Sequence, residues 1–149
     1  MGKQSVKVAH PDLVSGEITS LHSHSGIGGN IITEYSESEN DSTTTSTSWQ
    51  NKLTHTVETP GTYLIQWYFE FYGTSGSYHA RTQVQHNTTQ IANLQNETKD
   101  PSPASWDGGG GIKKLTLLQG DTIKINFCSE NASGTAHIRY ARIALIKIS

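Results

Sequence analysis

The clearest pattern in the chain is an alternation of large apolar residues that follows the turn at Pro60-Gly61. A period of two over residues 63–72 predicts a β-strand with one face on a hydrophobic core. The residues on that face are Tyr63, Ile65, Trp67, Phe69 and Phe71. The opposite face carries Leu64, Tyr68 and Tyr72. Because this second face is also largely apolar, we expect a neighbour to cover it.

The same period of two recurs along the rest of the chain. It predicts a half-exposed strand at 80–86, a short strand at 91–94, and strands at 115–117 and 123–127 on either side of a turn. In the last strand, 138–148, the pattern places Ile138, Tyr140, Ala144, Ile146 and Ile148 on one face and Ala141, Ile143 and Leu145 on the other. Eight or nine strands without a helix predict an all-β fold, an antiparallel jelly-roll sandwich.

Apolar residues are sparse before residue 42, and three glycines interrupt any regular element there. We therefore expect an extended N-terminal arm at 1–41 and a jelly-roll domain at 42–149. Two strands with apolar residues on both faces predict a second interface, most simply between copies of the chain. The residues expected at this trimer interface are Leu64, Tyr68, Tyr72, Ile143 and Leu145.

Composition narrows the classes of partner. The chain has 149 residues, a formal net charge of −2 and one cysteine, Cys128. One cysteine excludes an internal disulfide framework. The charge argues against nucleic acid as a partner, and no stretch reaches the roughly 20 apolar residues that membrane insertion requires. No apolar segment typical of a secretory signal occurs at residues 1–20.

Motifs for catalysis are absent from the sequence. There is no Gly-x-Ser-x-Gly, the glycines at 108–111 do not lead into a Gly-Lys-Ser/Thr phosphate loop, and Cys128 has no local motif around it. No pair of carboxylates has a spacing suited to acid–base chemistry. We therefore expect a protein that binds and is not an enzyme.

Several segments, in order, resemble the trimeric jelly-roll heads of the tumour necrosis factor and complement globular-head type. They are Pro60-Gly61-Thr62-Tyr63, the strand at 80–86, Leu117-Leu118-Gln119-Gly120-Asp121-Thr122-Ile123, and the apolar strand at 141–146. The resemblance covers about two thirds of the chain. It implies a ten-stranded jelly roll that forms trimers through aromatic and aliphatic residues on its inner sheet.

The segment His22-Ser23-His24-Ser25-Gly26 resembles the His-x-His-Ser-Gly segments of tailed-bacteriophage fibre and spike proteins. Such fibres are intertwined trimers in which His-x-His pairs can hold a metal on the threefold axis. In an extended chain, His22 and His24 lie on one side of the backbone. Three copies would offer six nitrogens, a set suited to iron or nickel. The alternative is that both histidines are solvated residues of a flexible arm.

A long loop is expected at 99–111, because this stretch holds two prolines and four successive glycines. Its candidate binding residues are Trp106, Asp107, Gly108 and Gly109. A mobile aromatic side chain on a loop can stack on a sugar or fill a pocket of a partner. The alternative is that Trp106 folds back over the end of its own sandwich.

Together these features lead us to expect a homotrimeric structural protein of a bacteriophage virion, assembled in the host cytoplasm. Its task would be capsid decoration as a head fibre, or attachment as the head of a tail fibre or spike. The partners would be a phage capsid or tail protein, or a glycan of the host surface. The alternative function is that of a free-standing, lectin-like carbohydrate-binding module, which would be monomeric.

Overall fold

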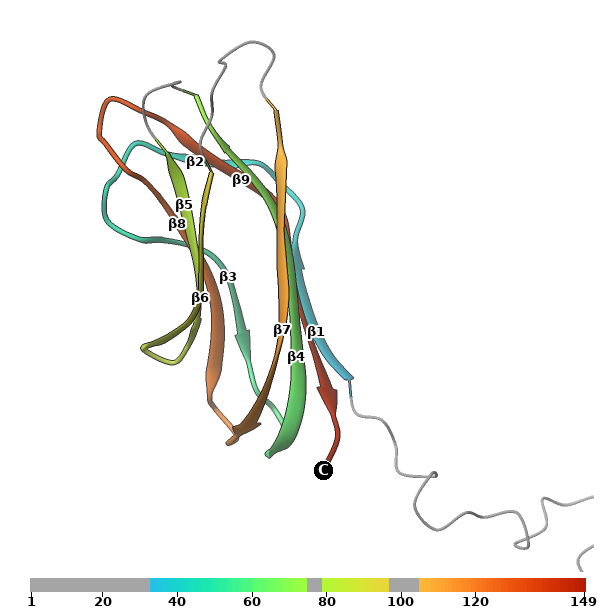
Figure 1. Ribbon diagram of the computed structural model, residues 1–149. Helices are drawn as coiled ribbons and strands as arrows, with labels where there is room; N and C mark the ends of the chain where they lie inside the picture. The colour runs from blue at the N-terminus through green and yellow to red at the C-terminus, as the bar shows by residue number, and fades with distance from the viewer. Residues whose placement is uncertain (1–32, 75–78, 97–104) are drawn as a thin grey trace, which may run out of the picture. The chain divides into compact units, whose positions relative to one another are not determined.

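The computed structural model describes residues 33–74, 79–96 and 105–149, which form two antiparallel β-sheets packed face to face (Figure 1). The strands are β1 (Thr33–Ser38), β2 (Ser42–Thr44), β3 (Gln50–Thr56), β4 (Gly61–Gly73), β5 (Ala80–His86), β6 (Thr89–Asn96), β7 (Asp107–Leu117), β8 (Thr122–Ser129) and β9 (Ala136–Lys147). Over these ranges the chain forms no helix, and so none that could cross a membrane.

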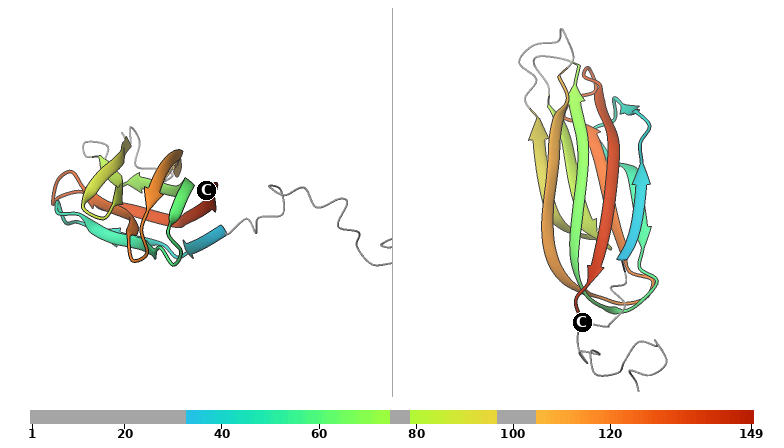
Figure 2. Two further views of the ribbon diagram at one scale, coloured as in Figure 1. Left: turned by 90° about the horizontal axis from the view of Figure 1, so that it is seen from below. Right: turned by 90° about the vertical axis from the view of Figure 1, so that its right-hand side faces the viewer.

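The chain passes repeatedly from one sheet to the other. One sheet has the strand order β1-β9-β4-β7, with β2 also paired to β9, and the second has the order β3-β8-β5-β6. Figure 2 shows the first sheet from its outer side, with β4 and β9 in the middle. This arrangement confirms the predicted all-β jelly-roll sandwich.

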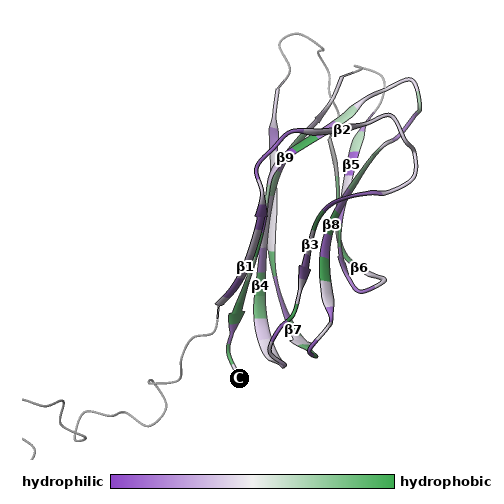
Figure 3. Ribbon diagram, turned by 180° about the vertical axis from the view of Figure 1, so that it is seen from behind, coloured by the Kyte–Doolittle hydropathy of each residue, from purple (hydrophilic) through white to green (hydrophobic). Residues whose placement is uncertain are grey.

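The inward face of β4 supplies much of the core. Tyr63, Ile65 and Phe69 are fully buried, and Trp67 and Phe71 are nearly so. Ile123, Ile125 and Phe127 of β8 face them from the other sheet, as the alternation in the sequence predicts. Figure 3 shows apolar segments on strands of both sheets. Burial of these side chains, at about 1.5–3 kcal/mol each, is the main force that holds the sheets together.

A β-bulge in β9 corrects part of the interface prediction. Tyr68 of β4 pairs with Arg142, but Glu70 pairs with Arg139, so β9 holds one extra residue between the two pairs. Tyr140 takes a left-handed backbone conformation there, with φ of 49°. Ile143 and Leu145 are fully buried between the sheets of a single chain, so they belong to the core and are not available to a second subunit.

The bulge also explains why strict alternation fails along this strand. Ile138 lies in the core on one side of the bulge, and Ala141 lies in the core on the other side, three residues later. Strict alternation would put these two residues on opposite faces. The extra residue reverses the pattern, which is the usual effect of a bulge on a strand.

The four glycines at 108–111 belong to β7 and not to a flexible loop. They pair with β4 in an unbroken register, from Glu70 opposite Gly108 to Trp67 opposite Gly111. The predicted binding loop is therefore wrong for Asp107, Gly108 and Gly109, which are strand residues. Only Trp106 precedes the strand.

The sandwich begins earlier than the predicted boundary at residue 41. Strand β1 pairs with β9 over its whole length, from Thr33 opposite Ile146 to Ser38 opposite Ala141. The sequence of residues 33–41 does not indicate this strand, because its serines and glutamates show no apolar alternation. The predicted metal ligands His22 and His24 lie outside the described residues.

Candidate functional site: the aromatic face

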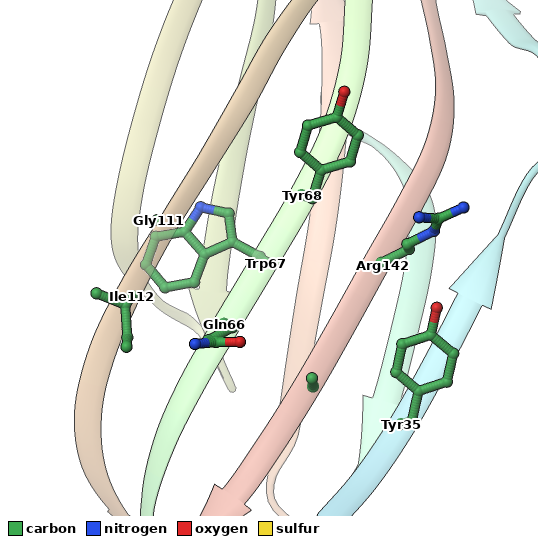
Figure 4. A pocket seen from close by; sticks show the side chains of 8 residues that line it. Tyr35, Gln66, Trp67, Tyr68, Gly111, Ile112 and Arg142 are labelled. Carbon is green, nitrogen blue, oxygen red and sulfur yellow. The ribbon is translucent and has the colours of Figure 1, made fainter.

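The outer side of the β1-β9-β4-β7 sheet carries a shallow hollow of ≈ 410 Å³. We call this surface the aromatic face. Its lining residues are Tyr35, Gln66, Trp67, Tyr68, Gly111, Ile112, Arg142 and Ala144. Figure 4 shows that these residues come from all four strands, with Tyr68 on β4, Arg142 on β9 and Tyr35 on β1.

Large apolar side chains on this face are exposed in the single chain. The exposed fractions are 51% for Tyr35, 40% for Tyr68 and 57% for Ile112. The alternation of each strand explains this placement, because successive residues of a strand point to opposite faces of the sheet. The residues on either side of Tyr68 in the sequence therefore point toward the core. A patch of this kind, rimmed by polar residues, typically marks an interaction site.

Hydrogen bonds within the chain hold both tyrosines of the hollow. The Tyr35 hydroxyl donates to Glu37 at 2.6 Å, and the Tyr68 hydroxyl donates to Glu70 at 3.0 Å. These bonds raise the pKa of both tyrosines, since loss of the phenol proton would set two negative charges together. The rings are therefore neutral donors with fixed directions.

The two arginines of the aromatic face are paired with carboxylates within the chain. Nε of Arg139 donates to Glu70 at 2.8 Å, and this bond is the main reason why the pKa of Glu70 is lowered. Arg142 lies 3.4 Å from Glu39 and 3.9 Å from Glu37. A second hollow of ≈ 440 Å³, lined by Tyr68, Glu70, Tyr140 and Arg142, extends the first toward these pairs. Because each arginine has a carboxylate partner, this face can be buried without leaving an isolated charge.

Trp106 packs onto the same sheet beyond the hollow. Its ring meets the Tyr72 ring edge-on at a centroid distance of 4.5 Å, and the Arg139 guanidinium carbon lies 3.9 Å from its centroid. Tyr72 in turn stacks on the His137 ring at 4.3 Å. Trp106 therefore packs against its own sheet, and its role in binding a partner stays a prediction.

The structure brings together only part of the predicted interface. Leu64, Tyr68 and Tyr72 lie on the outer side of β4, as their alternation indicates. Sequence reasoning missed Tyr35 and Ile112. The sequence carries no signal for Tyr35, because a single aromatic residue between Glu34 and Ser36 gives no apolar alternation. Ile112 had a weak signal, as a single large apolar residue between the glycines and two lysines.

A serine, a histidine and a glutamate form a polar chain between β1 and β3, which the sequence analysis did not anticipate. Ser36 Oγ lies 2.9 Å from His55 Nδ1, and His55 Nε2 lies 2.9 Å from Glu34 Oε2. Glu34 also accepts hydrogen bonds from the backbone N–H groups of Glu58 and Thr59 and from the Tyr63 hydroxyl. This carboxylate therefore anchors the turn between β3 and β4.

Burial acts to raise the pKa of Glu34, but these four hydrogen bonds outweigh burial and lower it. The same three residue types serve nucleophilic catalysis in hydrolases, where the carboxylate orients the histidine. Here the carboxylate also binds two backbone N–H groups, which gives it a structural task. Ser36 does not line any of the three hollows that the described residues form on the two sheet faces.

Among the described residues, no group of three or more His, Cys, Asp or Glu side chains is arranged to hold a metal ion. Histidine–carboxylate pairs do occur, such as His86 with Asp121 at 2.9 Å, but each provides too few ligands. The predicted metal site at His22 and His24 thus stays a prediction.

Comparisons with known proteins find only remote structural likeness. No family model and no curated protein matches the chain. Among solved structures, it is similar to Eiger TNF from S. frugiperda, with 15% identity and a TM-score of 0.47. The match covers 63% of this chain and 63% of the Eiger chain, so this chain spans less than two thirds of that relative.

Two further solved structures show the same kind of likeness. A pentameric capsid protein isolated from metagenomic phage sequences is 22% identical, with a TM-score of 0.39, and the match covers 78% of this chain and 62% of that one. The C-terminal CBM6 of LamC from Zobellia galactanivorans is 14% identical, with a TM-score of 0.40 and coverage of 64% and 70%.

Proposed function

We propose that this protein is a homotrimeric structural protein of a bacteriophage virion that acts by binding and not by turnover. The subunits meet through the aromatic face, and the opposite sheet stays accessible to other partners. The observation that carries the proposal is the group of exposed large side chains, Tyr35, Tyr68 and Ile112, around one hollow of a single chain.

The chemistry of this face suits contact between proteins. Tyrosine and arginine are the residue types that contribute most at protein interfaces, because they combine apolar area with hydrogen-bonding groups. Tyr68 and Arg142 line both hollows of the face and so lie at its centre. The arginine–glutamate pairs are already formed within each chain, so association need not desolvate a charge that has no partner.

The glycines of β7 allow a close approach to this face. Gly108 and Gly110 point outward next to Tyr68 and present backbone where other residues would present side chains. A partner can therefore lie flat against the Tyr68 ring and the strand. This feature supports a broad protein contact more than a deep ligand pocket.

The virion assignment rests on the sequence, through the resemblance of His22-Ser23-His24-Ser25-Gly26 to phage fibre segments. In the proposed trimer, His22 and His24 of three chains hold a transition ion, iron or nickel, on the threefold axis. The protein then serves either as a capsid decoration or head fibre, or as the head of a tail fibre or spike.

Sedimentation of the purified chain separates this proposal from the alternative of a free-standing carbohydrate-binding module. The proposal expects a trimer at micromolar concentration, and the alternative expects a monomer. A monomer would refute the subunit contact and the axial metal together.

A further inference from the structure

A row of amide side chains crosses the outer side of the second sheet. Asn51 of β3 pairs with Asn126 of β8, Asn126 pairs with Gln83 of β5, and Gln83 pairs with Asn93 of β6. Directly opposed residues share a face of the sheet, so the four amides form one line across all four strands. We call this line the amide row.

Two hydrogen bonds fix the orientation of two amides of the row, those of Asn51 and Asn126. Nδ2 of Asn51 donates to Oδ1 of Asn126 at 3.1 Å, and Nδ2 of Asn126 donates to Oε1 of Gln85 at 2.9 Å. The row therefore presents donors and acceptors at set positions. Such preorganisation lowers the side-chain entropy that the protein loses when it binds a ligand.

Gln83 is the most deeply placed amide of the row. It is 4% exposed, and it pairs with Asn126 on one side and Asn93 on the other. It lines a hollow of ≈ 330 Å³ together with Trp49, Asn51, Thr54, Gln85, Lys124 and Asn126. The amide side chains that line this hollow can both donate hydrogen bonds to ligand hydroxyl groups and accept them.

Trp49 borders the same hollow and is 40% exposed. It directly precedes β3, whose pairing with β8 fixes where the residue lies. An exposed indole provides a flat apolar surface for a ring with C–H groups on one side. Lys124 is the one charged residue that lines the hollow, and its ammonium group disfavours a cationic ligand. The other polar lining groups are amides and one hydroxyl, which bind neutral hydrogen-bonding groups.

We propose that this hollow binds a neutral glycan, with a sugar ring stacked on Trp49 and hydroxyl groups bonded to the amide row. Sugar hydroxyls both donate and accept hydrogen bonds, and so do the amides of Gln83 and Asn126. A peptide would also find donors and acceptors here, but the hollow has no apolar pocket for its side chains. The combination of fixed amides and one exposed indole therefore selects a glycan.

This inference builds on the proposed function, since it names a ligand for the binding role, but it uses the opposite sheet. Association through the aromatic face leaves the amide row uncovered. A trimer would then carry three glycan sites, and their combined binding to a surface would greatly exceed that of one site.

The test is binding of the full chain to an array of immobilised neutral and acidic oligosaccharides, followed by titration of the best neutral oligosaccharide in solution. The variants are Trp49→Ala, which changes an exposed side chain, and Gln83→Ala in the amide row. Leu118→Ala is the matched control, because Leu118 is 67% exposed and lies in the turn before β8. Circular dichroism checks that each variant is folded.

The inference expects binding to neutral oligosaccharides, weakened at least tenfold by Trp49→Ala and by Gln83→Ala and unchanged by Leu118→Ala. It is overturned if the wild-type chain binds no neutral oligosaccharide, or if both substitutions leave the affinity unchanged. The mass of the wild-type protein in solution separates the two proposals. A monomer whose glycan binding depends on Trp49 would refute the trimer and leave the glycan site standing. A trimer that binds no glycan would refute the glycan site and leave the trimer standing.

Discussion

Gly111 lies directly opposite Trp67 in the ladder between β4 and β7, and the Trp67 ring fills the space that a β-carbon on Gly111 would need. The same relationship holds one pair further along, where Phe69 fills the space beside Gly109. The inward glycines thus make room for the largest side chains of the core. This is a packing reason for glycine in a strand, and it requires no unusual backbone conformation.

We predict that Gly111→Ala lowers the free energy of unfolding by roughly 1–3 kcal/mol, the usual cost of overpacking a core. The added methyl group would overlap the buried ring of Trp67. Gly108→Ala is the control, because a β-carbon there meets the Tyr68 ring at 3.6 Å, an ordinary contact. Urea denaturation measures the free energy of unfolding of both variants. Equal stability of the two variants would show that Trp67 can move aside freely.

The sequence predicted the strands whose alternation is uninterrupted, as in β4, where large inward side chains follow one another without a break. It failed where a local feature changes the pattern. The bulge beside Tyr140 reversed the faces of Ile143 and Leu145, and no residue near it signals a bulge by type. The glycines of β7 indicate a loop when the sequence is taken alone, because their strand partners Trp67 and Phe69 lie far away along the chain.

The candidate site shows the same limit. Tyr68 and Tyr72 could be identified because they are aromatic residues on the outer side of β4, a strand with clear alternation. Tyr35 could not, since it lies in a short strand of glutamates and serines whose place is set by pairing with β9. The amide row could not be predicted from the sequence, because it depends on the register between four strands.

Trp106 is predicted to stabilise the sandwich and to play no part in recognition. Trp106→Ala removes the edge-on contact with Tyr72 and the cation–π contact with Arg139, which should cost about 1–2 kcal/mol. Chemical denaturation measures the loss, and binding to the oligosaccharide array should be unchanged. If Trp106→Ala keeps wild-type stability but no longer binds the oligosaccharides, Trp106 is a recognition residue.

Asp121 makes the stability of the fold sensitive to acid. It accepts hydrogen bonds from the Asn87 side chain and the Leu118 backbone N–H and lies 2.9 Å from His86, and these contacts lower its pKa from 3.8 to about 2. The lowered pKa means that the carboxylate stabilises the fold fully above pH 4. This stabilisation is lost as the pH falls from about 4 to about 2.

We therefore predict that Asp121→Asn loses on the order of 1–2 kcal/mol at pH 7 and much less at pH 2.5, relative to the wild type. Asn87→Gly is the companion variant. It removes the amide donor while it suits the left-handed backbone of residue 87, where φ is 54°. The stability that Asn87→Gly loses relative to the wild type should also become smaller as the pH falls from about 4 to about 2. If both losses are independent of pH, the Asp121 carboxylate is not the group responsible.

The proposed axial metal predicts one iron or nickel ion for every three chains in protein purified without an affinity tag. Elemental analysis measures the ratio, and dialysis against a chelator should lower the thermal midpoint. The double substitution His22→Ala and His24→Ala should abolish the metal and the effect of the chelator. A trimer that contains no metal and is indifferent to the double substitution would exclude the ligand role.

The subunit contact through the aromatic face predicts that Ile112→Asp weakens association at least tenfold, because it places a charge without a partner in the proposed interface. Tyr68→Ala should also weaken association, through loss of apolar contact. Leu118→Ala, which alters an equally exposed apolar residue away from this face, should have no effect. Dissociation constants from sedimentation equilibrium measure all three. Equal values for Ile112→Asp and Leu118→Ala would place the contact elsewhere.

The most direct test of the account is the mass of the wild-type chain in solution, measured by sedimentation velocity at micromolar concentration. The account predicts a single species of three times the chain mass of 16.3 kDa. A species of 16.3 kDa over the same concentration range would contradict it.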